Sequence, residues 1–214
     1  TLIEYRVEQF EALVFDLVQD VLIKKRHYPD AIRTFQFDMK GAIRGLVIDT
    51  EHGNILKLSR YAAIRESYHG TKSIDFKAQQ AFYGSTYIDL KHPNYEVIDT
   101  SFSIAFCVLY SQLIDLKDKN KHHMPSYRVM AKDVLEVVDE VHRDGSLKQK
   151  IASNVDKYVI KNRNLVHDML RFVRYGKKIL LITNSEYEYM KKLLDYAINP
   201  YLPKGMRWDN LFEY

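Results

Sequence analysis

The sequence predicts an α/β fold in which helices cover a parallel sheet. Three patterns indicate this class: a long helical pattern near the start, a β-rich stretch typical of a hairpin, and the aliphatic run Ile179–Ile182. A continuous aliphatic run of strand length is typical of a strand covered on both faces, as in a parallel sheet. We therefore expect residues 179–182 to form a central strand.

Length and composition suit one large domain, or a domain with an insertion. The chain has 214 residues, 46% of them hydrophobic, and a formal net charge of only +4, so no basic block indicates a nucleic-acid partner. Cys107 is the single cysteine, which excludes an internal disulfide and suits a buried thiol in a reducing compartment. No run approaches the ~20 apolar residues that cross a membrane. We expect a cytoplasmic protein without membrane or nucleic-acid partners.

The first third of the chain predicts a helix followed by a hairpin. The helix should begin near Tyr5 and end before Tyr28-Pro29. Its apolar face would comprise Phe10, Leu13, Val14, Leu17, Val18, Val21 and Leu22. Two β-rich runs then flank Glu51-His52-Gly53-Asn54, where Gly53 would take the positive φ and His52 would be exposed.

The rest of the chain predicts helices. Residues 72–98 give no firm assignment, and a buried helix should follow from Ser101. His122-His123 lies in a polar stretch and is expected to be a solvated loop, because adjacent histidines rarely bind one metal ion. Ser126 can cap a helix that Gly145 ends. Two more helices are expected over residues 147–158 and 164–175.

The turn after the aliphatic run is the main candidate site. Thr183-Asn184-Ser185 would lie where a strand ends and a helix begins, and Ser185 with Glu188 fits an S-x-x-E capping box. Ligands bind at the carboxyl ends of strands in open α/β sheets, and a helix amino end favours an anion such as phosphate. The alternative is that Thr183 and Ser185 only cap the helix.

The whole chain resembles the cytosolic purine 5'-nucleotidases of the haloacid dehalogenase (HAD) superfamily, most closely the members that prefer IMP and GMP. Several long matches occur in order, which is more specific than any lone motif. The matching stretches are TLIEYRVEQFEALVFDLV, RGLVIDTEHGNILKL, YHGTK, IDTSFSIAF, SYRVMAKDVLEVVDEVHRDGSLKQK and KKILLITNSEY.

The resemblance implies a partial HAD-like Rossmann-type core with a mainly helical cap. Residues 1–76 would be the first part of the core, residues 77–145 the cap and residues 146–214 the second part. In this family the first Asp of a D-x-D-x-T motif attacks the phosphorus and the second is the general acid and base, and Thr1 matches only the motif's final Thr. The later Lys and the acidic Mg²⁺ motif find no match before Tyr214. We therefore expect a fragment that is inactive alone, from a Mg²⁺-dependent parent.

The resemblance also implies the roles of individual residues. The expected catalytic residues are Thr183 and Asn184, and the expected substrate-binding residues are Phe102, Ser103, Asp139, His142, Lys148 and Ser185. Ser103 stands where some relatives have an amide, and Leu135 stands where an Arg contacts the base, which puts base preference in doubt. Without the resemblance, Phe102 suits a core position and Asp139 with His142 suits a pair on a helix surface.

The expected function is hydrolysis of purine nucleoside 5'-monophosphates through an aspartyl-phosphate. Two alternatives remain: a nucleotide-binding or regulatory protein that has lost the chemistry, and a HAD phosphatase for another small phosphate ester. The expected partner is the nucleotide substrate, and a homo-oligomer is possible because family members often form one.

Overall fold

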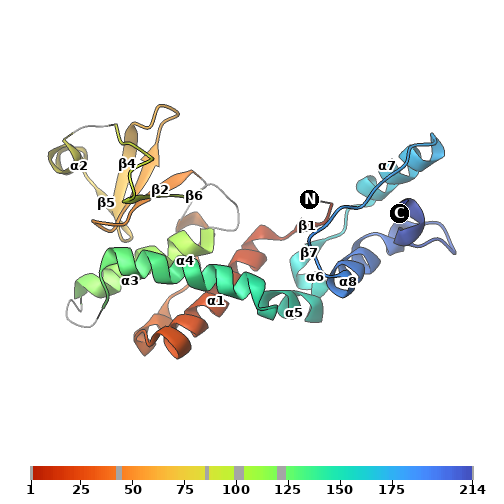
Figure 1. Ribbon diagram of the computed structural model, residues 1–214, viewed down its shortest axis with the longest axis horizontal. Coiled ribbons are helices and arrows are strands. Elements are labelled where there is room, and N and C mark those ends of the chain that lie inside the picture. Colours follow the sequence, from red (N-terminus) through yellow and green to blue (C-terminus); the bar gives the residue numbers. More distant parts are fainter. Residues whose placement is uncertain (1, 42–44, 85–86, 99–103, 120–123, 214) are drawn as a thin grey trace. The chain divides into compact units, whose positions relative to one another are not determined.

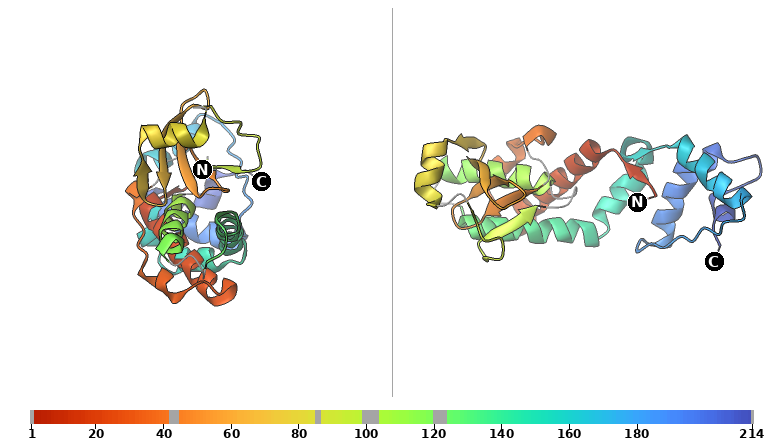
Figure 2. Two further views of the ribbon diagram at one scale, coloured as in Figure 1. Left: turned by 90° about the vertical axis from the view of Figure 1, so that its left-hand side faces the viewer. Right: turned by 90° about the horizontal axis from the view of Figure 1, so that it is seen from above.

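The computed structural model describes residues 2–41, 45–84, 87–98, 104–119 and 124–213. The chain divides into two compact units. The first, called the sheet unit here, comprises residues 11–144. The second, called the terminal unit, comprises residues 1–10 and 145–214. Figures 1 and 2 show the elements of each unit.

The first helix is present as expected. Helix α1 runs over Val7–Arg26 and ends before Tyr28, as the sequence predicts. Phe10, Val14, Val18 and Leu22 along it are buried, which confirms the apolar face. Two short 3-10 helices follow, η1 over Asp30–Thr34 and η2 over Met39–Gly41.

The sheet unit contains a five-stranded sheet with strand order β5-β4-β3-β2-β6. The strands are β2 (Leu46–Asp49), β3 (Asn54–Leu58), β4 (Ile64–His69), β5 (Lys72–Ile74) and β6 (Tyr95–Ile98). Every neighbouring pair is antiparallel. The β2–β3 hairpin is confirmed, and Gly53 at its tip has φ 71°.

Helices cover this sheet. Helix α2 (Phe76–Tyr83) has Asp75 as its N-cap, and the Asp75 carboxylate accepts from the amides of Lys77 and Ala78. Tyr83 at the end of α2 packs against the cluster of Val47, Leu56 and Ile64. Helix α3 (Ile104–Lys119) is almost wholly buried along its first ten residues and packs against α4 (Tyr127–Arg143) (Figure 1). Cys107 on α3 is buried, as expected.

Two predictions about the helices have different outcomes. Ser126 caps α4 by accepting from the Val129 amide, as predicted. The single helix expected over residues 147–158 is instead two, α5 (Ser146–Ser153) and α6 (Val155–Tyr158). The break lies at Asn154, whose φ of −147° and ψ of 66° are not helical.

The terminal unit is mainly helical. Its strands β1 (Glu4–Tyr5) and β7 (Val159–Ile160) form a short antiparallel pair. Helix α7 covers Arg163–Arg174 and helix α8 covers Tyr187–Ala197, followed by the 3-10 helices η4 (Asn199–Tyr201) and η5 (Trp208–Leu211).

The expected parallel sheet is wrong for the described residues. Both sheets are antiparallel, and residues 179–182 form no strand. Leu180 is 62% exposed and Ile182 is 92% exposed, so the run is not covered on both faces. A central strand needs a hydrogen-bonded strand on each side. Among the described residues Ile179 instead accepts a backbone hydrogen bond of 2.8 Å from Glu213 in a non-strand segment.

Candidate functional site

The Thr183-Asn184-Ser185 turn precedes helix α8. The Thr183 Oγ1 accepts a hydrogen bond of 3.0 Å from the Ser185 amide, and α8 begins at Tyr187 with Glu186 as its N-cap. The predicted capping box of Ser185 and Glu188 is therefore wrong, because the helix begins one residue too late for Ser185 to be the N-cap. The turn is held by the Thr183 hydroxyl instead. This contact leaves the hydroxyl proton of Thr183 available to donate.

The turn borders a cavity of about 450 Å³, called the Thr183 cavity here. Residues 181–185 form one wall, and Leu2, Ile3 and Tyr5 form part of another. The Tyr5 hydroxyl lies 2.9 Å from the Tyr189 hydroxyl of α8, and burial raises the pKa of both tyrosines. The turn and the first residues of the chain therefore meet at one cavity, although they are far apart in the sequence.

Lys148 lies close to the same turn. It extends from α5, and its Nζ lies 3.4 Å from the Glu186 carboxylate, directly after Ser185. A second cavity of about 390 Å³ separates this part of α5 from α8, and Lys191 and Lys192 line it with Lys148. Glu186 and Glu188 also line it, so its charge is mixed. The terminal unit thus brings Lys148 and residues 183–185 into one region.

Asp139 and His142 share helix α4 of the sheet unit. Asp139 is exposed, and His142 is half-buried with its Nδ1 2.7 Å from the Val138 carbonyl oxygen. A carbonyl only accepts, so the ring donates through Nδ1. Phe102 and Ser103 lie outside the described residues, as does His122-His123. The grouping of Asp139 and His142 with Phe102 and Ser103 therefore stays a prediction.

Comparison with known proteins identifies the family. The sequence model of the 5' nucleotidase family matches residues 1–214. The chain belongs to the 5' nucleotidase family. A 5'-nucleotidase domain-containing protein of Dictyostelium discoideum is 31% identical over 214 residues, which cover 96% of this chain and 36% of that protein.

Two mammalian members of the 5' nucleotidase family are also similar. The 5'-nucleotidase domain-containing protein 2 of Rattus norvegicus is 26% identical over 94% of this chain and 37% of its own length. The protein of the same name from Homo sapiens is 25% identical over 94% of this chain and 39% of its own length. The chain thus spans less than two fifths of these curated relatives.

Neither a metal site nor a membrane-spanning helix is present in the described residues of this 5' nucleotidase family member. They contain no group of three or more His, Cys, Asp or Glu side chains that could hold a metal ion. Within the same ranges, no helix has both the length and the apolar character needed to cross a bilayer.

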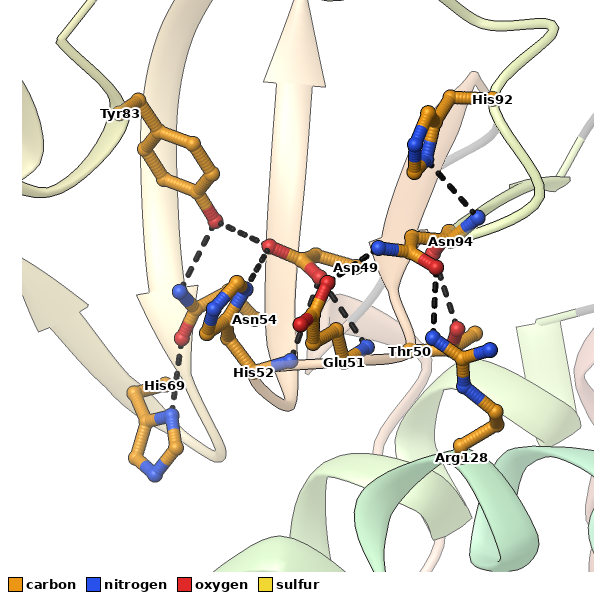
Figure 3. Close-up of polar contacts among 10 residues, drawn as sticks. All are labelled: Asp49, Thr50, Glu51, His52, Asn54, His69, Tyr83, His92, Asn94 and Arg128. Atoms are coloured by element: carbon orange, nitrogen blue, oxygen red, sulfur yellow. Dashed lines mark hydrogen bonds and ion pairs between the residues drawn. The ribbon is translucent and has the colours of Figure 1, made fainter.

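A buried polar cluster at the β2–β3 turn escaped the sequence analysis (Figure 3). Asp49 is only 1% exposed and accepts from the backbone amides of Glu51 and His52. Its second oxygen lies 2.9 Å from the Tyr83 hydroxyl and 2.9 Å from His52 Nδ1. His52 is exposed, as expected, yet it is bound to a buried carboxylate. The signal was an Asp at the last strand position before the turn, where its carboxylate can accept from the amides of the turn.

Proposed function

We propose that the full-length protein is a HAD-superfamily 5'-nucleotidase that hydrolyses purine nucleoside 5'-monophosphates, with IMP and GMP preferred. The family match over the whole chain supports the reaction class. The preference for purines, the aspartyl-phosphate intermediate and a cytoplasmic location rest on the resemblance alone.

One observation carries the proposal for the site. The Thr183 turn lines the Thr183 cavity together with Leu2, Ile3 and Tyr5. The resemblance assigns the donor motif to the turn, and it assigns the end of the nucleophile motif to the position directly before Leu2. A phosphoryl group in transfer needs its nucleophile and its fixed donors around one centre. Leu2, the residue that directly follows the position of the nucleophile motif, lines the same cavity as the donor turn, which supports this requirement.

The residues of the terminal unit would bind the phosphate. Thr183 would donate its hydroxyl proton to a phosphoryl oxygen while its oxygen still accepts from the Ser185 amide. The amides at the start of α8, with Asn184 and Ser185, would add donors and positive potential. Lys148 would supply a positive charge after it exchanges its exposed partner Glu186 for the phosphate.

The resemblance assigns recognition of the base to Phe102, Asp139 and His142. The types of Phe102 and His142 suit stacking on a purine, and the Asp139 carboxylate can accept an N–H of the base. Ser103 and Leu135 depart from the pattern of the relatives. These residue types therefore do not predict which of IMP and GMP has the higher kcat/KM.

A magnesium requirement is part of the proposal for the full-length protein. The described residues of this chain offer no set of ligands for the ion. When bound, such an ion neutralises charge on a transferring phosphoryl group.

Steady-state hydrolysis by the full-length protein tests the proposed function. With Mg²⁺ present, kcat/KM should be higher for IMP and GMP than for AMP, and higher for each than for p-nitrophenyl phosphate. Removal of divalent ions by EDTA should abolish turnover. Saturable IMP binding without phosphate release would instead favour the non-catalytic alternative. Equal kcat/KM for all substrates would favour a general phosphatase. Hydrolysis of IMP by residues 1–214 alone would contradict the expectation that this chain is inactive.

A further inference from the structure

Tyr5 and Tyr189 form a pair of hydroxyl groups that links two cavities of the terminal unit. Their hydroxyl oxygens lie 2.9 Å apart, and either can be the donor. Tyr5 lines the Thr183 cavity, and Tyr189 lines the second cavity, between α5 and α8. Burial raises the pKa of both tyrosines above their ordinary value of 10.0, so both hydroxyls are protonated at neutral pH.

Only one of these two hydroxyl protons is used inside the pair. A hydroxyl donates one hydrogen bond, so one tyrosine donates to its neighbour and the other keeps its own proton. Their mutual contact is the only hydrogen bond that the described residues give to either hydroxyl. Whichever way the pair is oriented, one O–H group is therefore free to donate to a ligand.

The lining of the Thr183 cavity has polar side chains in two places. The three residues of the Thr183 turn supply the first, and Tyr5 supplies the second. The other described residues of the lining are Leu, Ile and Met. An apolar cavity with a few placed polar groups is typical of a small-molecule site, in which the polar groups orient the ligand. Tyr5 therefore adds a donor from a part of the chain far from the turn.

Two contacts hold the Tyr5 side chain in place. Tyr5 is the last residue of β1 and pairs with Val159 of β7. Its ring meets the Phe10 ring edge-on, with centroids 5.2 Å apart. A side chain that is already ordered loses little freedom when a ligand binds. Tyr5 is thus suited to be a donor of fixed position.

We propose that Tyr5 donates its hydroxyl proton to a phosphate oxygen in the Thr183 cavity, and that Tyr189 positions Tyr5 by donating to the Tyr5 oxygen. This role rests on the proposed function, which places the phosphate of the substrate in that cavity. An anion there attracts the free proton of the pair and so selects the orientation in which Tyr189 is the internal donor. The hydrogen bond from Tyr189 also polarises the Tyr5 hydroxyl and makes it a stronger donor.

The second cavity favours the opposite orientation less. Lys148 and Lys191 in its lining are each paired with a carboxylate, so they attract an added anion less strongly. If Tyr5 donated to Tyr189, the free proton would belong to Tyr189, and the described residues provide no further acceptor for it. A phosphate in the Thr183 cavity supplies the missing acceptor on the Tyr5 side.

Binding of inorganic phosphate to the full-length protein, measured by isothermal titration calorimetry, tests the assignment. Tyr5→Phe should weaken binding about tenfold, because it removes a donor to a charged oxygen. Tyr189→Phe should weaken it less than about threefold, because Tyr5 keeps its proton. The double variant should bind as weakly as Tyr5→Phe alone, because Tyr189 acts only through Tyr5. Tyr196→Phe is the matched control: it removes another hydroxyl of α8, whose partner is Asp156, and should keep the wild-type affinity.

A purely structural pair would give a different result. Both single variants delete the same hydrogen bond, so they should lower the melting temperature by similar amounts. A structural role would also weaken phosphate binding equally in the two variants. Equal losses of affinity, or no loss in Tyr5→Phe, would overturn the proposal.

Carbon-13 NMR of the wild-type protein decides the question if Tyr5→Phe does not fold. With tyrosine labelled at Cζ, two signals should shift together as inorganic phosphate is added, one from each member of the pair. Both shifts should saturate with the phosphate affinity that calorimetry gives. Tyrosine Cζ signals that stay unchanged at saturating phosphate would overturn the proposal.

The result is separable from that of the proposed function. IMP hydrolysis by the wild type, with equal phosphate affinity in wild type and Tyr5→Phe, would keep the nucleotidase and remove Tyr5 from its site. The expected order of phosphate affinities in a protein that does not hydrolyse IMP would keep Tyr5 as a phosphate ligand and contradict the nucleotidase. A wild-type protein that binds no phosphate at millimolar concentration would overturn the role of Tyr5.

Discussion

Asp195 on α8 is the centre of a polar contact that holds the C-terminal segment to the helix. Its Oδ1 accepts from Trp208 Nε1 at 2.9 Å, from Asn199 Nδ2 at 2.9 Å and from Arg207 Nη2 at 3.2 Å. Its Oδ2 accepts from Lys191 at 2.9 Å. Replacing Asp195 by Ala removes all of these acceptors at once and leaves the donors in place.

The expected loss of stability comes mainly from Trp208. Trp208 is only 6% exposed, so its indole N–H would remain buried without its acceptor, at a cost of about 1–3 kcal/mol. The ion pairs of Asp195 with Lys191 and Arg207 are partly exposed and should contribute about 0.2–1 kcal/mol each. Asp195→Ala should therefore destabilise the terminal unit by about 2–4 kcal/mol.

A double-mutant cycle separates these terms. Trp208→Phe removes the indole N–H, so Asp195→Ala should cost about 1–3 kcal/mol less in that background. In a Lys191→Ala background the saving should stay below about 1 kcal/mol. Hydrogen exchange of α8 peptides, followed by mass spectrometry, reports the local opening free energy in the full-length protein. A coupling to Trp208 no larger than the coupling to Lys191 would refute the reasoning.

The same contact predicts a dependence on acid. Partial burial alone would raise the pKa of Asp195, but hydrogen bonds from Lys191 and Trp208 outweigh it and hold the pKa below its ordinary value of 3.8. A lowered folded-state pKa gives stability that is present above the ordinary value and is lost as pH falls through the folded value. The extra α8 protection of wild type over Asp195→Asn should therefore persist at neutral pH and shrink in acid. An unchanged difference in acid would contradict this sign.

Three further predictions concern the proposed site and the hairpin. In the full-length enzyme, Thr183→Val should lower kcat on IMP about a hundredfold, since one donor to a transition-state oxygen is typically worth ~3 kcal/mol, whereas Thr183→Ser should retain most activity. Asp139→Asn should mainly raise KM for purine nucleotides and spare p-nitrophenyl phosphate turnover; equal losses on both substrates would remove Asp139 from base recognition. Gly53→Ala should destabilise the sheet unit by about 1–3 kcal/mol in urea unfolding, because an added Cβ would lie 2.7 Å from the Tyr127 ring and φ is positive. Wild-type stability in Gly53→Ala would contradict this close packing.

Local signals predicted the elements that depend on local interactions. The bounds of α1 follow from its apolar period and from Tyr28-Pro29, and the β2–β3 turn follows from Gly53. Residues 72–98 resisted assignment, yet Asp75 as an N-cap and Gly84 at the C-terminus of α2 were readable signals. The β6 strand had none, because its pairing with β2 depends on a chain segment far away in sequence.

The candidate site was predictable to different degrees. Periodicity placed Thr183 before a helix, and the structure adds the cavity it shares with Leu2 and Ile3. Nothing in the sequence linked Tyr5 to Tyr189, because the two are 184 positions apart and each is ordinary in its own element. Hydrogen-bond networks of this kind depend on tertiary packing, so residue type alone cannot reveal them.

The aliphatic run Ile179–Ile182 shows why an apolar pattern alone predicts a strand incorrectly. The pattern measures how strongly these side chains favour burial, and Leu180 and Ile182 have that tendency whether or not anything covers them. A strand additionally needs backbone partners, and its pattern cannot supply them. The described residues provide no neighbouring strand, so this apolar run has no strand pairing. The side chains of Leu180 and Ile182 therefore remain exposed. The exposed run and the Thr183 turn are continuous in sequence. The Thr183 hydroxyl that follows the run is positioned instead by the hydrogen bond that it accepts from the Ser185 amide, so the geometry of the proposed phosphate site depends on the turn and not on strand pairing.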